Sequence, residues 1–411
     1  MKNILFVSIA FPPKLDPECI QTGRYYKYLV QKHPELQFHV VTSANPTRFM
    51  PVNDDLQTLL PKNHPTFELK LFEPWLLHAL LNKALPLALQ FPDSKYSFPL
   101  QWRKVIKQLS TPPDLIYSRS YPLSSTLMAL KLQKHFGVPW VMHLSDPWTD
   151  SPLHRYGGLS YRVNTAWEQT CFSRASYITL TSEKTVEFYR NKFPHWANKF
   201  ICMPNVYDPH DLKPTARENA PERKLRFVYT GGLANTRTAE PILAAIAGLR
   251  KNQPELLERC EFIWAGDMDS RNRALFEQYA DPAITHLGAL GYRKALELQK
   301  SADVLIAIDT KIASNDSAMF FPSKLLDYWT TGHRLLALTT PGSTTDEFVK
   351  KFQLGTAVYF DTGTEAITDT LAAHVHQYIQ KNTAFFTIPA PDRAFAADFN
   401  AGRLAEIFNS L

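Results

Sequence analysis

Short apolar runs alternate with helical stretches along the first half of the chain. Residues 4–9 form a continuous, partly β-branched apolar run, which predicts a strand buried on both faces, and residues 23–32 predict a helix after it. Further strands are predicted at 38–42, 115–118, 140–144, 177–181 and 200–203, with helices at 124–136 and 183–192. This alternation is typical of a parallel sheet wound with helices.

A polar segment with three prolines, residues 205–224, interrupts the pattern and predicts an interdomain linker. The alternation then resumes, with strands predicted at 226–229, 261–265, 284–287, 304–308, 335–338 and 357–359. We therefore expect an α/β fold with two doubly wound, Rossmann-like domains, residues 1–204 and 225–390, facing each other across a cleft. A last helix within 391–411 is expected to cross back to the first domain.

Residues 320–334 carry the most informative local pattern. Pro322 suits the first position of a helix, so the amides of Ser323, Lys324 and Leu325 are expected to point toward an anion. Lys324 would add a positive charge. Asp327, about one turn further on, can accept two hydrogen bonds from the vicinal hydroxyl groups of a ribose. Gly332 is expected to end this helix. An ordinary capped helix explains the same residues.

Small residues follow several predicted strands of the second half. Gly231 and Gly232 follow the first strand, Gly266 the second and Gly288 the third. Parallel sheets bind ligands beyond the carboxyl ends of their strands, and glycine allows close approach of the backbone there. A tight turn explains any one of these glycines, but their shared position favours a binding site.

Composition excludes several classes of protein. The chain has 411 residues, 45% of them hydrophobic, and a net charge of +6 without a long run of Lys or Arg, so no nucleic acid is expected as a partner. An anionic small molecule or an anionic membrane surface fits better. The four cysteines have neither zinc-site nor disulfide spacing. No signal sequence and no apolar stretch of membrane-spanning length is evident, so we expect a cytoplasmic location.

Four stretches of the second half resemble family-4 retaining glycosyltransferases of the GT-B fold, of the bacterial polysaccharide or lipid-linked glycan type. These stretches are Phe-Val-Tyr-Thr-Gly-Gly-Leu at 227–233 with Arg237, Phe-Ile-Trp-Ala-Gly-Asp at 262–267, residues 286–290 leading to 302–308, and Pro-Ser-Lys-Leu-Leu-Asp-Tyr at 322–328. In the first half, residues 114–120, 141–148 and 204–208 resemble the same family. The order and spacing of the stretches, more than any one of them, carry the resemblance.

The resemblance implies roles for the phosphate-binding residues. Arg237 stands where the family usually has a lysine that binds the donor phosphates, and a guanidinium can bind them bidentately. Gly232 stands where an arginine is common, and Lys324 is the candidate to replace it. Gly23, after the first strand, would let the first domain approach the diphosphate.

Other positions are implied to bind the nucleoside and the sugar. Asp327 matches the second acid of the family's paired-glutamate motif, which binds the ribose. The first acid falls on Met319, and Asp316 is the nearest carboxylate that could substitute for it. Backbone groups near Leu290 would face the base.

The family resemblance implies sugar transfer from a UDP- or GDP-sugar to a glycan, lipid-linked or other hydroxyl acceptor, with retention. It implies neither a cofactor nor a metal. Asp267 and Asp269 match a metal-binding D-x-D pattern, but their place after a strand favours a turn and a helix cap. His143 and Asp146 are candidates to position the acceptor, although His143 could equally belong to the core. Arg119, at another strand end, could face the ligand.

Three questions stay open from the sequence. A nucleotide-sugar epimerase of the same fold would use the same donor site, and Met319 argues mildly against it. A non-catalytic GT-B binding partner is also consistent with the weakened acid motif. The apolar segment 75–89, with Lys95, Arg103, Lys104 and Lys107 beyond it, predicts either a contact with a membrane surface or a helical hairpin buried under the first sheet.

Overall fold

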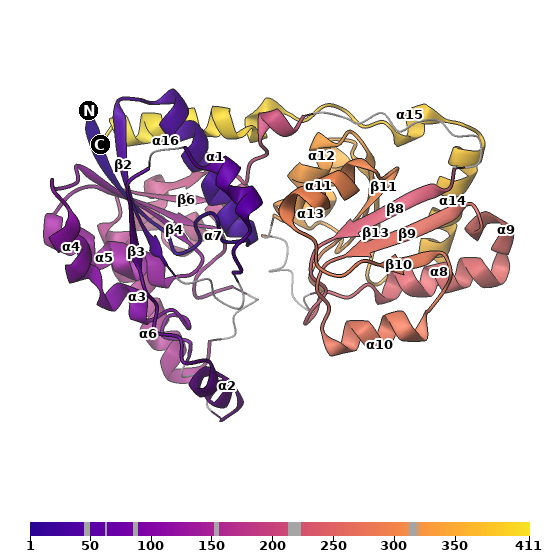
Figure 1. Ribbon diagram of the computed structural model, residues 1–411, viewed down its shortest axis with the longest axis horizontal. Coiled ribbons are helices and arrows are strands. Elements are labelled where there is room, and N and C mark those ends of the chain that lie inside the picture. The colour runs from indigo at the N-terminus through magenta and orange to yellow at the C-terminus, as the bar shows by residue number, and fades with distance from the viewer. Residues whose placement is uncertain are drawn as a thin grey trace. The chain divides into compact units, whose positions relative to one another are not determined.

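The computed structural model describes residues 1–44, 50–61, 64–84, 89–151, 156–212, 223–311, 319 and 321–411. The chain divides into two compact units, Met1–Pro209 with Arg393–Leu411, and His210–Asp392. Each unit is built around its own parallel sheet, with helices on both faces (Figure 1).

The first unit has, over the described residues, a seven-stranded sheet in the order β3–β2–β1–β4–β5–β6–β7. Its strands are β1 (Lys2–Val7), β2 (Leu36–Ser43), β3 (Thr66–Leu69), β4 (Leu115–Ser120), β5 (Trp140–Leu144), β6 (Tyr177–Leu180) and β7 (Phe200–Cys202). Its helices are α1 (Pro17–Lys32), α2 (Trp75–Ala84), α3 (Ser97–Leu100), α4 (Trp102–Gln108), α5 (Ser124–Phe136), α6 (Gly158–Arg174), α7 (Glu183–Lys192) and α16 (Ala397–Asn409).

Alternate residues of β1 face different helices, which explains the continuous apolar run there. Ile4 and Phe6 pack in one core with α1 and α16, whereas Leu5 and Val7 pack in another with α5. All four side chains have no exposed surface. A strand covered on both faces needs apolar residues at every position, so the sequence pattern and the layered structure agree.

The second unit repeats the plan, with six parallel strands in the order β10–β9–β8–β11–β12–β13 in its described part. The strands are β8 (Leu225–Thr230), β9 (Cys260–Ala265), β10 (Ile284–His286), β11 (Val304–Ile308), β12 (Arg334–Thr339) and β13 (Gly355–Tyr359). The helices are α8 (Glu240–Asn252), α9 (Pro254–Leu257), α10 (Ser270–Gln278), α11 (Tyr292–Lys300), α12 (Lys324–Thr330), α13 (Thr344–Lys351), α14 (Thr364–Ile379) and α15 (Thr383–Phe386). Phe227 and Tyr229 of β8 share a core with α8 and α14.

The segment that follows β7 belongs to the first unit as far as Pro209. The backbone of Val206 donates to Gln21 Oε1 at 2.7 Å and accepts from Arg24 at 2.8 Å, and Lys27 pairs with Asp208 at 2.6 Å. These bonds attach residues 205–208 to α1. The predicted linker, 205–224, therefore begins later than the sequence pattern suggests, and its residues 213–222 lie outside the described part of the chain.

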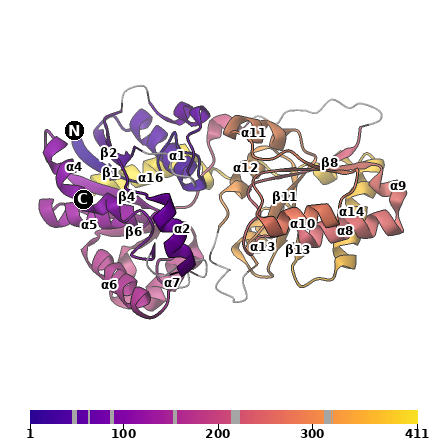
Figure 2. The same cartoon turned by 60° about the horizontal axis from the view of Figure 1, so that its bottom comes forward.

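The C-terminal helix α16 packs within the first unit, beside α1 (Figure 2). Lys2 Nζ donates to the Phe408 carbonyl at 2.7 Å, and the Phe408 ring lies 5.1 Å from that of Tyr117. Residue 397 donates its amide to the Tyr207 carbonyl at 2.9 Å. The end of the chain thus completes the core under β1 and β4.

Two elements differ from the expectation. Helix α1 begins at Pro17, not at residue 23, because Asp16 caps it by accepting from the Glu18 amide at 2.9 Å. The interpretation of 75–89 as a buried hairpin is wrong where the segment is described, since Leu76 and Leu80 of α2 are 61% and 65% exposed. Residues 85–88 lie outside the described range.

We expect the substitution Phe408→Ala to destabilise the first unit by about 3–5 kcal/mol, because it removes a fully buried ring. Phe399→Ala on the same helix is the matched control, since its side chain is 43% exposed and its loss should change stability by less than about 0.5 kcal/mol. Urea unfolding with hydrogen-exchange readout on β1 and β4 measures both. Equal effects of the two variants would contradict the role of α16.

Candidate functional site

Two glycines at the carboxyl ends of β8 and β9 allow the two loops to lie close to each other and to Lys324. Gly231 and Gly266 have φ of +136° and +138°, a region that L side chains rarely adopt. A Cβ atom on Gly266 would collide with the carbonyl of Gly231, and one on Gly231 would collide with Nζ of Lys324. The missing side chain of Gly231 therefore makes the space that the Lys324 ammonium occupies.

Lys324 lies over the end of β8. Its Nζ donates to the Thr230 carbonyl at 2.9 Å and lies 4.7 Å from the ring centre of Tyr229. Burial and, after it, the Arg237 guanidinium lower its pKa to about 7, although the carboxylates of Asp309 and Asp327 partly offset both effects. The amine is therefore only partly protonated at neutral pH and would gain charge on meeting an anion.

Arg237 supplies a second cation. Its amide donates to the Ala234 carbonyl at 3.0 Å in the loop after β8, and its guanidinium donates to Thr310 Oγ1 at 3.4 Å. Its Nε is buried and has no hydrogen-bond partner among the residues that the structure describes. Sequence reasoning placed Arg237, Lys324, Gly231 and Gly266 in one site, and the second unit brings these residues together.

Asp309, which the sequence reasoning missed, directly follows β11. Thr339 donates to its carboxylate, and Thr345 Oγ1 donates at 3.0 Å. Burial raises the pKa of Asp309, against the opposing effects of these hydroxyls, Arg237 and Lys324. The sequence did contain a signal for this residue, because Asp309 is an acid that comes immediately after a fully apolar strand. The site thus has a buried carboxylate whose charge acts on both of its cations.

The start of α12 differs from the prediction in two ways. Ser323 is the N-cap residue and the helix begins at Lys324, so Pro322 lies before the cap and not at the first helical position. The Leu325 amide is not free, because it donates to the Pro322 carbonyl at 3.1 Å. A tight first turn therefore uses one of the three amides assigned to an anion. The prediction for Gly332 is confirmed, since it follows the C-cap with φ of +76°.

The remaining predicted donor-site positions differ in how far they are buried. Asp327 is half-buried on α12 and lies close enough to Lys324 to influence its pKa. Leu290 is half-buried in the loop between β10 and α11, and Gly232 is exposed after β8. Met319 is buried, at 8% exposure, whereas Asp316 lies outside the described residues.

The D-x-D pattern is a helix cap, as its position predicts. Asp269 is the N-cap of α10 and accepts from the Asn272 and Asn235 amides, both at 2.9 Å. The bond from Asn272 is the main cause that lowers the pKa of Asp269. Across the described part of the chain, no group of three or more His, Cys, Asp or Glu residues is arranged to hold a metal ion.

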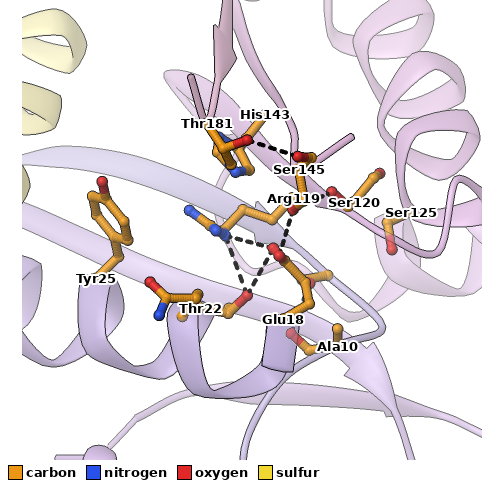
Figure 3. Close-up of polar contacts among 12 residues, drawn as sticks. Ala10, Glu18, Thr22, Tyr25, Arg119, Ser120, Ser125, His143, Ser145 and Thr181 are labelled. Atoms are coloured by element: carbon orange, nitrogen blue, oxygen red, sulfur yellow. Dashed lines mark hydrogen bonds and ion pairs between the residues drawn. The ribbon is translucent and has the colours of Figure 1, made fainter. Parts of the chain in front are cut away.

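In the first unit, a different set of charges gathers at the carboxyl ends of β4 and β5 (Figure 3). Arg119 of β4 is fully buried, and its Nε donates to Glu18 Oε1 at 3.0 Å. Ser145, directly after β5, donates to the other oxygen of Glu18. Burial raises the pKa of Glu18, and Arg119 partly offsets this. Arg119 therefore faces Glu18 on α1, and its charge is paired with that carboxylate.

Asp146 extends this cluster. It is half-buried beside Glu18 and Asp16, and burial, followed by the charges of these two acids, raises its pKa to about 7. The pKa of Asp16 is raised to about 6, chiefly by burial. Sequence reasoning found Asp146 but missed both neighbours, which lie about 130 residues earlier and meet it only through the parallel pairing of β1, β4 and β5.

His143 and Gly23 are placed differently from Asp146. His143 has no exposed surface, and its Nδ1 lies 3.0 Å from Thr179 Oγ1 inside the sheet layer. Burial lowers the pKa of His143 well below its usual value, so its ring is neutral. Gly23 is buried within α1, where a Cβ atom would collide with Pro12 and crowd Leu59. Helix packing therefore explains the need for glycine at this position, and the contact of Gly23 with a diphosphate stays a prediction.

Buried polar residues of α6 and α7 hold the loop that carries Asp146. Thr149 Oγ1 donates to the Glu168 carboxylate at 2.6 Å, and the Trp148 indole donates to Asn164 at 2.9 Å. Tyr189 accepts from the Trp148 amide at 2.8 Å and donates to Glu168 at 2.8 Å. These bonds fix the backbone just beyond Asp146.

A groove of about 810 Å³ opens elsewhere on the second unit, lined by Arg334, Lys350, Gln353 and Thr387 among others. Arg334 begins β12, whereas the glycines and cations described above follow the ends of strands. The groove is therefore at the opposite edge of the sheet from the candidate site.

Comparison with known proteins supports the fold and the family resemblance. Residues 57–228, less than half of the chain, match a family model described as a glycosyl transferase 4-like domain. No curated protein matches the sequence significantly.

Solved structures align over the whole chain. The Anabaena protein HepE, crystallised with UDP, has a TM-score of 0.63 and 14% identity over 100% of both chains. Sucrose-phosphate synthase from Thermosynechococcus elongatus has a TM-score of 0.68 and 14% identity, and the alignment covers 100% of this chain and 99% of the synthase. A Listeria monocytogenes protein named as a candidate UDP-N-acetylglucosamine 2-epimerase has a TM-score of 0.62 and 12% identity. The alignment covers 100% of this chain and 96% of the Listeria protein. At these identities the likeness establishes the fold, and the chain has the α/β GT-B fold that its sequence predicts.

Proposed function

We propose that the protein is a retaining glycosyltransferase that transfers a sugar from a UDP- or GDP-sugar to a hydroxyl group of a glycan or lipid-linked acceptor. The observation that carries the proposal is the pair of cations, Lys324 and Arg237, beside the glycine turn after β8. Cations held in place before the reaction can stabilise the negative charge that develops on a departing diphosphate. They supply this charge without a bound metal ion.

Each donor-site residue has a distinct role in the proposal. Lys324 and Arg237 bind the diphosphate oxygens, and the glycine turns let the backbone lie beside them. Asp327 accepts hydrogen bonds from the ribose hydroxyls. The family resemblance places Met319 where an acid usually contacts the donor sugar, so no carboxylate nucleophile is proposed. Retention would then follow from attack on the same face as the leaving phosphate.

Asp146 is our candidate to orient the acceptor hydroxyl and to take up its proton. A carboxylate with a pKa about 7 is a better proton acceptor at neutral pH than an ordinary one. His143 is less suited to touch an acceptor, because its side chain is fully buried. The expected cytoplasmic location stays a prediction.

A two-step experiment tests the function. Thermal shift with UDP, GDP, ADP and CDP identifies the nucleotide, because a ligand that binds only the native state raises its melting temperature. The matching sugar nucleotides are then incubated with and without hydroxyl acceptors, in the presence of EDTA, and the anomeric configuration of the product is determined by NMR. No shift with any nucleotide would contradict the proposal.

The epimerase is the second candidate, favoured by the epimerase-like structural neighbour of the same fold. An isomerised donor in the sample without acceptor would support it. A nucleotide that binds but never turns over with any acceptor would point to the non-catalytic partner instead.

Asp327→Ala should weaken UDP or GDP binding by about 1–3 kcal/mol, because the ribose hydroxyls lose their acceptor. Asp369→Ala, an exposed carboxylate on α14, is the control and should leave the affinity unchanged. Isothermal titration calorimetry measures both. An unchanged affinity for Asp327→Ala would remove the ribose assignment.

Binding of UDP should be coupled to proton uptake by Lys324. The pKa of this ammonium is about 7 in the free protein, and a bound diphosphate would raise it, so about half a proton should be taken up at pH 7. Affinity should fall as pH rises above 7. Calorimetry in buffers of different ionisation enthalpy measures the uptake, which Lys324→Met should abolish. Lys294→Met, at an exposed site of α11, should not change it.

Asp146→Asn should stabilise the first unit above neutral pH. The folded-state pKa of Asp146 is raised to about 7, so the native state holds its proton more tightly and stability falls as pH rises from about 4 to 7. The neutral amide avoids burying a charge, and we expect a gain of about 1–2 kcal/mol at pH 8 and a flatter profile. Urea unfolding at several pH values measures this. The exposed Asp54→Asn is the control, and parallel profiles for both variants and the parent would contradict the assignment.

A further inference from the structure

Large apolar side chains are exposed on the surface of the first unit in α2, just before it and at the end of α3. Phe72, Leu76, Leu80 and Leu100 are 62%, 61%, 65% and 66% exposed. Isolated exposed leucines are ordinary, but several within one short stretch of the fold indicate a contact surface.

The orientation of α2 explains why this surface is exposed. Leu76 and Leu80 are four residues apart and therefore lie on the same face of the helix. His78 points the other way, toward the first unit, where its ring lies 6.1 Å from that of Tyr96. An ion pair between Glu73 and Lys95 holds the chain just before the helix. Helix α2 is thus attached by one face and leaves its leucines exposed. It lies at the lower end of the first unit in Figure 1.

Exposed cations lie beside these apolar residues. Gln101 links two of them, because its side chain donates to the Lys70 carbonyl at 2.9 Å and accepts from Lys104 Nζ at 3.0 Å. Leu100 immediately precedes Gln101. Lys83 lies in the last turn of α2, and Arg103 lies beside Lys104 on α4. All four cations are exposed, whereas Lys95, which the sequence pattern had grouped with them, is buried in its ion pair with Glu73.

We propose that this surface, called here the apolar–basic face and made of Phe72, Leu76, Leu80 and Leu100 with Lys70, Lys83, Arg103 and Lys104, binds an anionic lipid bilayer. The leucines and the phenylalanine insert at the level of the headgroups, and the cations meet the lipid phosphates. Helix α2 has ten residues, fewer than a membrane span needs. In the described part of the chain, no helix is long and apolar enough to cross a membrane.

The charge favours a bilayer over a protein as the occupant. A surface for another protein needs no excess of one sign, whereas an apolar centre flanked by cations complements both the apolar interior and the negative headgroups of a membrane. This inference goes beyond the proposed glycosyl transfer and does not require it, because membrane binding involves neither donor nor acceptor.

Co-sedimentation with vesicles tests the proposal. The 411-residue protein should bind vesicles made of equal parts phosphatidylglycerol and phosphatidylcholine. It should bind vesicles of phosphatidylcholine alone much more weakly. Leu76→Ser with Leu80→Ser should reduce the partition coefficient by about tenfold or more. Lys83→Glu with Lys104→Glu should reduce it by at least about fivefold per charge and remove the salt dependence.

A matched control is available at exposed apolar residues of the second unit. Leu287→Ser with Ile379→Ser, at 47% and 50% exposure, should leave vesicle binding unchanged. An unchanged melting temperature shows that each variant is folded, and the charge variant keeps the test valid if the serine variant is not.

Three results would overturn the proposal. The parent protein could stay in solution with anionic vesicles, or the variants of the face could bind as well as the control does. Alternatively, the parent could fail to bind vesicles yet form oligomers that Leu76→Ser with Leu80→Ser abolishes, which would assign the face to a second copy of the chain.

Discussion

Two cations at the carboxyl edge of the second sheet are the constraint on which the proposed donor site depends. Burial and, after it, the Arg237 guanidinium lower the pKa of Lys324. The protein tolerates the arrangement because the Thr230 carbonyl and the Asp309 carboxylate partly compensate it. A diphosphate would complete the compensation, so the unbound site already holds the interactions that favour an anionic leaving group. Gly231 is part of the same constraint, since any side chain there would displace the ammonium.

The first unit has the same kind of sheet but gathers carboxyl groups, not cations, at the carboxyl ends of its strands. At the ends of β4 and β5, Arg119 pairs with Glu18, Asp16 and Asp146 lie close enough to add their charges, and burial raises the pKa of all three acids. Excess positive charge suits a group that leaves as an anion, whereas a carboxylate of raised pKa suits a hydroxyl that must lose a proton. Both units bring residues from distant parts of the sequence together by one rule, because parallel strands end at a common edge. The difference between the roles proposed for the two units lies in a few side chains at that edge.

The sequence pattern predicts buried elements well and partly exposed or polar ones poorly. The predicted bounds of β5, β11, α5 and α7 are confirmed, because each has a clear apolar period or run. Strand β3 was missed: it lies at the edge of the sheet, has four residues and is half-exposed over most of its length. At the site, the helix-start pattern at 320–334 and the family resemblance predicted Lys324 and Arg237, which the structure brings together, but neither could find Asp16 and Glu18. Pro322 was misplaced, because a proline pattern does not distinguish the residue before a cap from the first helical position, and the glycine pattern did not reveal that Gly23 packs against Pro12.

Helix α6 was missed for a more instructive reason. Its buried residues include Ser160, Asn164 and Glu168, spaced by four, so the helical period is present but is carried by polar side chains that an apolar pattern does not reveal. Two of them bind the loop after β5, Asn164 through the Trp148 indole and Glu168 through Thr149. A leucine in place of Glu168 would restore the sequence signal and bury more apolar surface, but it would leave the Thr149 amide without its acceptor and the Thr149 hydroxyl with Asp150 alone. The polar face of α6 therefore makes the helix hard to predict from an apolar pattern, but it fixes the loop after β5. This loop carries Asp146 at the end of the sheet.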